Sequence, residues 1–212
     1  MRWISGMLCV AALLVGGPSH AGETREKAQA AEDKAEVLEE KAASQAPVPA
    51  DTPPITRSEA RAVDPDGEAP LDDPITCLAR SIYWEAKGAP AQDMESVASV
   101  VMNRLGDGAF PKTVCAVVKQ GSESHSCQFS WWCDGRPDEA VEDDRFTLAR
   151  EIARKALNGQ LRDRTDGALY FHDRNVSPSW AKKFTRTAQT QRLLFYKPRL
   201  EEPLAGTQDG AP

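Results

Sequence analysis

Glu85 lies where an apolar, helix-like run meets a glycine, in the stretch SIYWEAKGAP of residues 81–90. Steps of three, four and three residues connect this glutamate with the apolar residues before it, which is the spacing of one helix face. That face is formed by Ile75, Leu78, Ile82 and Glu85. Beside Tyr83 and Trp84, a carboxyl group on this core-facing edge has a raised pKa, because burial disfavours the ionised form. A carboxylic acid that stays protonated near neutral pH can donate a proton to the leaving oxygen of a glycosidic bond.

Taken alone, Glu85 fits a salt-bridged structural residue better than a catalytic acid. Glycosidases usually pair their acid with a second carboxylate, and Asp134 is the best candidate for that partner. The catalytic interpretation therefore depends on what surrounds Glu85.

Aromatic residues gather in two later segments, CQFSWWCDG at 127–135 and the region 170–180. Flat apolar rings beside hydrogen-bonding side chains are suited to a groove that binds sugars. The alternative is that these rings belong to the core. The candidate substrate-contacting residues are Tyr83, Gln128, Ser130, Trp131, Trp132, Asp134, Tyr170, His172 and Trp180.

The two ends of the chain differ in composition from its middle. Arg2 and the apolar run ISGMLCVAALLV, ending in SHA at Ala21, predict a signal peptide over residues 1–21. An uncleaved membrane anchor is the alternative, although the run is short for a membrane span. Residues 22–74 are rich in Ala, Glu, Lys and Pro, so we expect a disordered acidic linker, and a disordered tail over 201–212. One domain remains, at 75–200.

Charge separates the same pieces. Residues 22–74 carry 14 acidic and 6 basic side chains, whereas residues 75–200 carry 15 acidic and 19 basic ones. The mildly basic domain favours an anionic partner such as a cell-wall polymer. Export makes nucleic acid the poorest candidate partner. Nothing in the sequence defines an oligomeric state.

Four cysteines follow the predicted signal peptide: Cys77, Cys115, Cys127 and Cys133. An even number in an exported chain predicts two disulfides, with three possible pairings. We favour Cys127 with Cys133, which closes a local loop, and Cys77 with Cys115, which ties the first helix to the third. Four free buried thiols are the alternative.

Other chemistries find little support in the sequence. His125 and His172 with a carboxylate could hold zinc in principle, but no H-x-H or H-E-x-x-H pair occurs. We therefore expect no metal and no cofactor, and we expect His172 to form hydrogen bonds in a cleft or in the core. No G-x-S-x-G motif is present, and an oxidising compartment argues against an activated Cys–His pair.

The elements that position these residues are mainly helical. Asp73 and Pro74 predict the start of the first helix, Gly88 its end, and Arg80 and Lys87 its solvent-facing positions. Further helices are expected over residues 92–105, 112–120 and 138–157, and short β-like segments over residues 167–173 and 192–198. The fold class is therefore mainly helical α+β with a small β element.

Seven stretches in order across residues 77–197 resemble the cell wall hydrolase family of the spore-cortex-lytic enzymes SleB and CwlJ. They are LARSIYWEAKG, ESVASVVMNRL, FPKTVCAVVKQ, CQFSWWCDG, ALYFHD, PSWAKKF and FYK. The resemblance implies a lysozyme-like, lytic-transglycosylase-like catalytic domain that acts on peptidoglycan glycan strands. The glutamate of the family motif Y-x-E-A-[RK]-G falls on Glu85, as the implied general acid and base.

The chain departs from the family pattern at two places. Ala89 stands where the family often has a glutamate, and Gln191 and Leu193 replace the Gly and His of the family ending G-x-H-x-F-Y. The second departure concerns substrate contacts of the last strand, whereas the glutamate of the family motif is present at Glu85.

Three functions are carried forward from the sequence. The leading one is an exported, periplasmic peptidoglycan hydrolase without a stable membrane anchor, which cuts the MurNAc–GlcNAc bond as a lytic transglycosylase with Glu85 alone. Ordinary hydrolysis would add Asp134 as a second carboxylate. The alternatives from other classes are a non-catalytic wall-binding domain and a zinc amidase that cuts the peptide stem.

Overall fold

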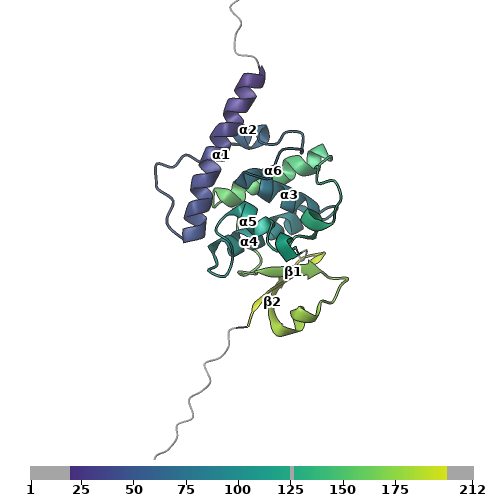
Figure 1. The fold of residues 1–212 in the computed structure, drawn as a ribbon. Helices are drawn as coiled ribbons and strands as arrows, with labels where there is room; N and C mark the ends of the chain where they lie inside the picture. The colour runs from purple at the N-terminus through teal and green to yellow at the C-terminus, as the bar shows by residue number, and fades with distance from the viewer. Residues whose placement is uncertain (1–19, 125–126, 200–212) are drawn as a thin grey trace, which may run out of the picture.

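The computed structural model describes residues 20–124 and 127–199 as a helical body with a small sheet at one end (Figure 1). The helices are α1 (His20–Ser44), α2 (Arg57–Ala62), α3 (Pro74–Glu85), α4 (Ala91–Gly106), α5 (Val114–Val118) and α6 (Asp143–Leu157). The 3₁₀ turns are η1 (Ser122–Ser124), η2 (Ser130–Cys133) and η3 (Ser179–Lys183). The strands are β1 (Tyr170–Asp173), β2 (Phe184–Gln189) and β3 (Leu193–Pro198). This architecture confirms the mainly helical α+β class with a small β element.

The centre of the body is α3, which is buried along its length from Pro74 to Tyr83. The Asp73 side chain caps it by accepting hydrogen bonds from the backbone amides of Ile75 (2.8 Å) and Thr76 (2.9 Å), as the sequence predicts. The helix packs against α1, α4, α5 and α6. It ends at Glu85, and Gly88 follows with a positive φ of 74°.

The other helices predicted from the sequence are all present, but their lengths differ from the prediction. Helix α4 spans nearly the expected residues, whereas α5 is shorter than 112–120. Helix α6 begins at Asp143 instead of 138, because backbone groups of residues 138–140 form hydrogen bonds with other parts of the chain. The carbonyl of Asp138 accepts hydrogen bonds from Arg80 and Trp84, and the amide of Ala140 donates to the carbonyl of Gly67 (3.0 Å).

Arg80 corrects one expectation, since it is 2% exposed instead of facing solvent. Its Nε donates to Asp64 Oδ2 (2.8 Å), and its Nη1 donates to the Asp138 carbonyl (2.6 Å). The side chain is therefore a buried connection between α3, the segment after α2 and the segment before α6. A buried cation of this kind requires such partners.

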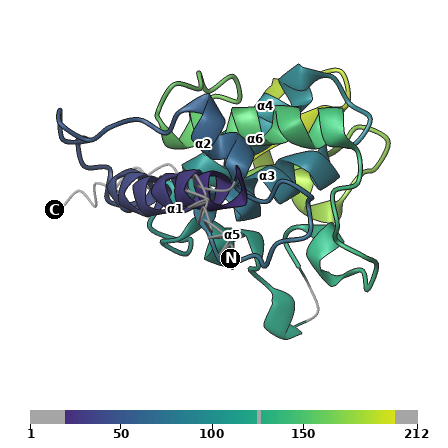
Figure 2. The same ribbon diagram turned by 90° about the horizontal axis from the view of Figure 1, so that it is seen from above.

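The segment expected to be a disordered linker is also different. Helix α1 packs on α2, α3, α4 and α6, and α2 packs on α6 (Figures 1 and 2). The buried residues of this segment include Ala31, Ala35, Leu38, Ile55, Ala60 and Val63. The sequence pattern hides this packing because the stripe on α1 is mostly alanine, whose small side chain permits close helix approach without a strong apolar signal. Four of the prolines, at positions 47, 49, 53 and 54, lie in the connection between the two helices.

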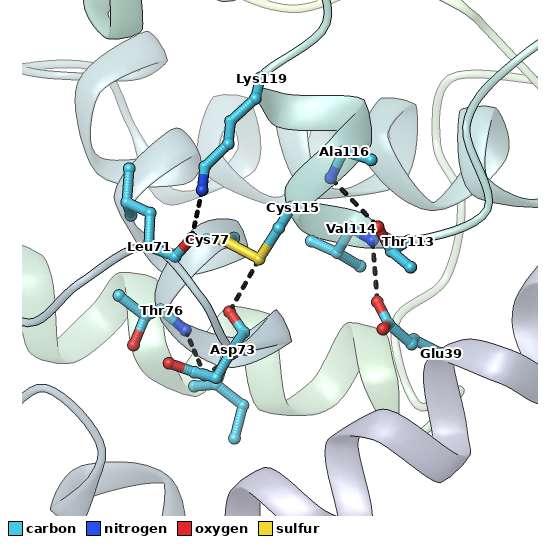
Figure 3. Close-up of a disulfide and its surroundings, with 11 residues drawn as sticks. Glu39, Leu71, Asp73, Thr76, Cys77, Thr113, Val114, Cys115, Ala116 and Lys119 are labelled. Carbon is cyan, nitrogen blue, oxygen red and sulfur yellow. Dashed lines mark hydrogen bonds between the residues drawn. A yellow bond between two sulfur atoms is a disulfide. The ribbon is translucent and has the colours of Figure 1, made fainter.

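Polar contacts fix α1 to its neighbours. Lys34 pairs with Glu59 of α2 (2.7 Å), and Gln45 donates to the carbonyl of Gly106 at the end of α4 (2.9 Å). Glu39 accepts from the backbone amide of Val114 at the start of α5 (2.8 Å; Figure 3). The helical body therefore begins well before residue 75.

The sheet is antiparallel, with the order β1–β3–β2. Tyr170 lies opposite Tyr196, and His172 lies opposite Leu194. Strands β1 and β3 fall in the two segments predicted from the sequence, but β2 was not predicted. Its pairing with β3 is irregular between Arg186 and Ala188, which interrupts the alternation that marks a strand.

Both favoured disulfide pairings are present in the structure. Cys77 of α3 joins Cys115 of α5 with a Cα–Cα distance of 5.2 Å, beside the cap of α3 (Figure 3). Cys127 joins Cys133 with a Cα–Cα distance of 6.0 Å and closes the loop that holds η2. Apart from His20 and Ala21 in α1, the predicted signal peptide lies outside the described residues, as does the predicted tail. Among the described helices, none is long and apolar enough to cross a membrane.

Adjacent residues of α1 provide a test of its packing. Leu38→Ala should lower the free energy of unfolding by about 2–4 kcal/mol, because the side chain is 4% exposed. Val37→Ala is the matched control, since Val37 is 42% exposed and should cost less than about 0.5 kcal/mol. Urea denaturation of both variants checks this. Equal, small losses would mean that α1 does not pack on the body.

The disulfides are tested by mass mapping, under non-reducing conditions, of protein produced in an oxidising compartment. We expect the linked peptides Cys77–Cys115 and Cys127–Cys133. Replacing both cysteines of the first pair by serine should cost roughly 2–5 kcal/mol of stability. Two or more free thiols in protein recovered from an oxidising compartment would contradict both pairings.

Candidate active site

A cavity of about 360 Å³ opens beside the C-terminal end of α3. Four chain segments form it: the end of α3, the η2 loop with the residues after it, strand β1, and the turn between β2 and β3. Its lining residues are Trp84, Glu85, Gln128, Ser130, Trp131, Asp134, Arg136, Pro137, Asp138, Phe171, His172, Asp173, Arg192 and Leu193. Residues far apart in sequence therefore meet around the carboxyl group of Glu85.

The carboxyl group of Glu85 is partly buried, and burial raises its pKa to about 7. Arg104, a hydrogen bond from the backbone of Ser130, and Arg192 act in the opposite direction, since each favours the charged form. Both the protonated and the charged form are therefore accessible near neutral pH. The group can donate a proton and then, as a carboxylate, accept one, which are the two roles of a general acid and base.

Arg104 of α4 is the buried cation that faces Glu85. Its side chain lies within 5.5 Å of the ring centres of Phe110, Phe129 and Tyr170, and its Nε donates to the carbonyl of Leu169 (2.7 Å). Its Nη1 is buried without a hydrogen-bond partner among the described residues. Burial lowers the pKa of this guanidinium to about 10, so it stays charged at neutral pH. The sequence analysis missed Arg104, although a lone arginine among the apolar residues of VVMNRL is itself a signal of a buried cation.

Arg192, in the turn between β2 and β3, lies at the edge of the same cavity. Its Nε donates to Asp173 Oδ2 of β1 (2.7 Å), and its Nη1 donates to the carbonyl of Lys87 just after α3 (2.8 Å). It thereby fastens the sheet to the end of the helix that carries Glu85. The family pattern directed attention to its neighbours Gln191 and Leu193, and Leu193 is a buried residue of the cavity wall.

A second cavity of about 450 Å³ lies beside the first and shares Gln128 and Phe171 with it. It is mainly aromatic, and its other lining residues are Arg104, Cys127, Tyr170, Trp180 and Phe184. The rings of Tyr170 and Trp180 lie 5.8 Å apart. The acidic group and the aromatic surface are therefore separated only by the residues that the two cavities share.

Most of the candidate residues from the sequence meet in these cavities. Glu85, Gln128, Ser130, Trp131, Asp134 and His172 line the first cavity, and Tyr170 and Trp180 line the second. His172 is held by hydrogen bonds to the Tyr196 hydroxyl (3.0 Å) and the Asp173 carbonyl (2.8 Å), and its ring stacks on Tyr196.

Tyr83 and Trp132 do not line either cavity. Tyr83 is 1% exposed and packs edge-on against Trp84 and Phe146, so its expected role in substrate contact is wrong. Tyr83 directly follows Ile82 of the apolar face, and the core of the body extends around the helix to include it. Trp132 points instead toward Lys119, whose Nζ lies 5.2 Å from the ring centre.

Three further carboxylates share the first cavity with Glu85. Asp173 is paired with Arg192, and Asp134 accepts from the backbone amide of Arg136 (2.9 Å). Burial raises the pKa of Asp138, and the nearby Asp134 raises it further. Within residues 20–124 and 127–199, no three His, Cys, Asp or Glu side chains are grouped so that they could hold a metal ion. His125 lies outside the described residues.

A carboxylic acid with a pKa near 7 at a cavity with an aromatic extension has the properties of a general acid and base site. The sequence pattern of the cell wall hydrolase family matches residues 88–196, and the chain belongs to that family. The matched region includes most of the residues of both cavities. It begins just after Glu85, so the role of this glutamate depends on the geometry and on the local motif.

Curated relatives carry the name spore cortex-lytic enzyme. That of Halalkalibacterium halodurans is 32% identical over 112 residues, which are 51% of this chain and 29% of the relative. That of Oceanobacillus iheyensis is 30% identical over 129 residues, which are 58% of this chain and 41% of the relative. This chain therefore matches less than half the length of either relative.

Solved structures of catalytic domains are also similar. The catalytic domain of the Bacillus cereus SleB protein is 25% identical, with a TM-score of 0.48 over 58% of this chain and 88% of that domain. The catalytic domain of the germination-specific lytic transglycosylase SleB from Bacillus anthracis is also 25% identical. Its TM-score is 0.48 over 62% of this chain and 98% of that domain.

Arg104 offers a test of the electrostatics at Glu85. Arg104→Gln removes the cation that lowers the pKa of Glu85, so this pKa should rise above about 7. Arg104→Lys retains the charge and should produce a smaller rise. Carbon NMR of the labelled glutamate carboxyl during a pH titration measures both, with Glu85→Gln identifying the resonance. An unchanged pKa in a folded Arg104→Gln protein would show that the two groups do not interact.

Proposed function

We propose that this chain is an exported peptidoglycan-cleaving enzyme that cuts the glycosidic bond between MurNAc and GlcNAc with Glu85 as general acid and base. The observation that carries this proposal is the carboxyl group of Glu85, which has a pKa of about 7 in a cavity shared with sugar-compatible side chains. Family membership supports the cell wall as the place of action. A periplasmic location is part of the proposal, and it depends on the predicted signal peptide.

The protonated Glu85 would donate its proton to the leaving oxygen as the glycosidic bond breaks. The carboxylate that results lies near Arg104 and Arg192, and both cations favour this charged form. The charge that Glu85 acquires during the first step is therefore compensated by groups already in place, without reorganisation of water. The same carboxylate would then remove a proton in the second step.

We favour the C6 hydroxyl of the MurNAc sugar as the source of that second proton. Attack of this hydroxyl on C1 of the same sugar gives a 1,6-anhydro product, and one protein carboxylate is sufficient. The second candidate reaction is hydrolysis, in which a second carboxylate activates a water molecule. Asp134 lies in the same cavity and could be that carboxylate. The two reactions differ in their products, because hydrolysis leaves reducing ends.

Glu85→Gln tests the proposed role of the glutamate. The amide retains the shape of the side chain but cannot donate the proton, so cleavage of purified sacculi should fall about a hundredfold or more. Binding to sacculi should persist because both cavities remain. Mass analysis of released muropeptides measures the loss and also identifies anhydro or reducing ends in the wild-type digest. Full activity of the variant, or binding without release by the wild type, would favour a wall-binding domain, whereas free stems would indicate an amidase.

Two controls accompany this variant. Asp134→Asn should cause a small loss if a single carboxylate acts, and a loss as large as that of Glu85→Gln if two carboxylates act. Stability provides the second control. The pKa of Glu85 rises on folding, so its contribution to stability is full below about 4.5 and is lost as the pH rises through about 7. Glu85→Gln should therefore be more stable than the wild type at pH 8, on the order of 2 kcal/mol.

A further inference from the structure

The C-terminal part of the described chain is strongly basic. Residues 174–199 contain seven basic side chains and no acidic one, whereas residues 75–173 contain 12 basic and 15 acidic ones. The basic side chains are Arg174, Lys182, Lys183, Arg186, Arg192, Lys197 and Arg199. The positive excess of the domain thus arises entirely from η3, β2, β3 and their connections. This segment lies at the end of the molecule opposite α1 (Figure 1).

Most of these charges face solvent without a carboxylate partner. Six of the seven side chains are exposed, and Lys197 is partly buried. Within the described residues, Arg192 pairs with Asp173 and Lys197 pairs with Asp166. Arg174 and Arg199 donate to backbone carbonyls, which leaves their charge in place. Lys182, Lys183 and Arg186 form no ion pair within the described residues, and we call these three the basic cluster.

The basic cluster lies next in the chain to two residues of the aromatic cavity. Trp180, two residues before Lys182 in η3, lines that cavity, as does Phe184 directly after Lys183. The ring of Trp180 lies 5.5 Å from that of Phe184. A polymer whose sugars lie against these rings would carry its substituents past the basic cluster.

We propose that the basic cluster binds the carboxylates of the peptide stems that project from the glycan strand. This inference rests on the proposed function and extends it to the part of the substrate outside the glycosidic bond. The sugars carry N-acetyl groups and are joined to the stems through amides, both of which are neutral. The stems themselves carry carboxylates. Exposed ammonium and guanidinium groups attract such groups and raise the rate of encounter. A membrane surface is a poorer match, because Val176 is the only large exposed apolar residue of this segment among those described.

Binding is measured in the Glu85→Gln background, so that the substrate is not consumed. Lys182→Gln/Lys183→Gln/Arg186→Gln should weaken binding to intact sacculi roughly tenfold at low salt and reduce the salt dependence of binding. The control Arg57→Gln/Arg162→Gln/Arg164→Gln removes the same charge from exposed arginines outside the basic segment and should bind as the parent does. An amidase would leave a lactyl carboxylate on each MurNAc, so the uncharged control is chitin, a GlcNAc polymer without stems, which should bind the parent and both triple variants equally.

The remaining outcomes separate this inference from the proposed function. An equal loss on chitin would overturn it, because the cluster would then contact the sugars themselves. Two further results would overturn it. One is a loss of binding that occurs only with vesicles containing phosphatidylglycerol and not with sacculi. The other is equal binding by the basic-cluster variant and its control while the wild type still cleaves sacculi. If the wild type releases no muropeptides but the basic-cluster variant alone loses salt-sensitive binding to stem-bearing sacculi, stem recognition stands and the cleavage proposal fails.

Discussion

Burial of α3 on nearly all of its sides is the constraint on which the structure depends. A helix that is apolar around most of its circumference has to be enclosed by other elements, and α1, α4, α5 and α6 supply that enclosure. The enclosure ends at Glu85, where the helix stops and the cavity begins. The site therefore lies at the edge of the core, where a carboxyl group loses much of its hydration but remains reachable from solvent.

Buried cations are the second consequence of this arrangement. Arg80 has a carboxylate partner in Asp64. Arg104 instead contacts aromatic rings and a carbonyl group, and the carboxyl group of Glu85 lies beyond ion-pair distance from it. The first arrangement ties segments together, and the second maintains a positive potential next to Glu85. Because a desolvated charge acts over a longer distance than an exposed one, Arg104 influences Glu85 without direct contact.

The features predicted correctly from the sequence are those set by local rules. The cap at Asp73 and the apolar face that ends in Glu85 both follow from spacing along a few residues. The errors concern long-range packing. Alanines 31 and 35 gave α1 the composition of a solvated helix, and Tyr83 was placed in the groove because only the fold shows which aromatic rings α6 covers. Arg104 and Arg192 were missed because their importance arises from elements that lie far away in sequence.

The order of strands in the sheet has a consequence for the assembly of the site. Strand β3 is the last of the three in the chain but lies between β1 and β2, so neither outer strand has a partner until residues 193–198 are available. Arg192 and Leu193, which complete the wall around Glu85, arrive at the same moment. During directional emergence of the chain from a ribosome or a translocation channel, the cavity remains open on one side until residues 193–198 have passed. The topology thus delays formation of the site until β3, the central strand of the sheet, has emerged.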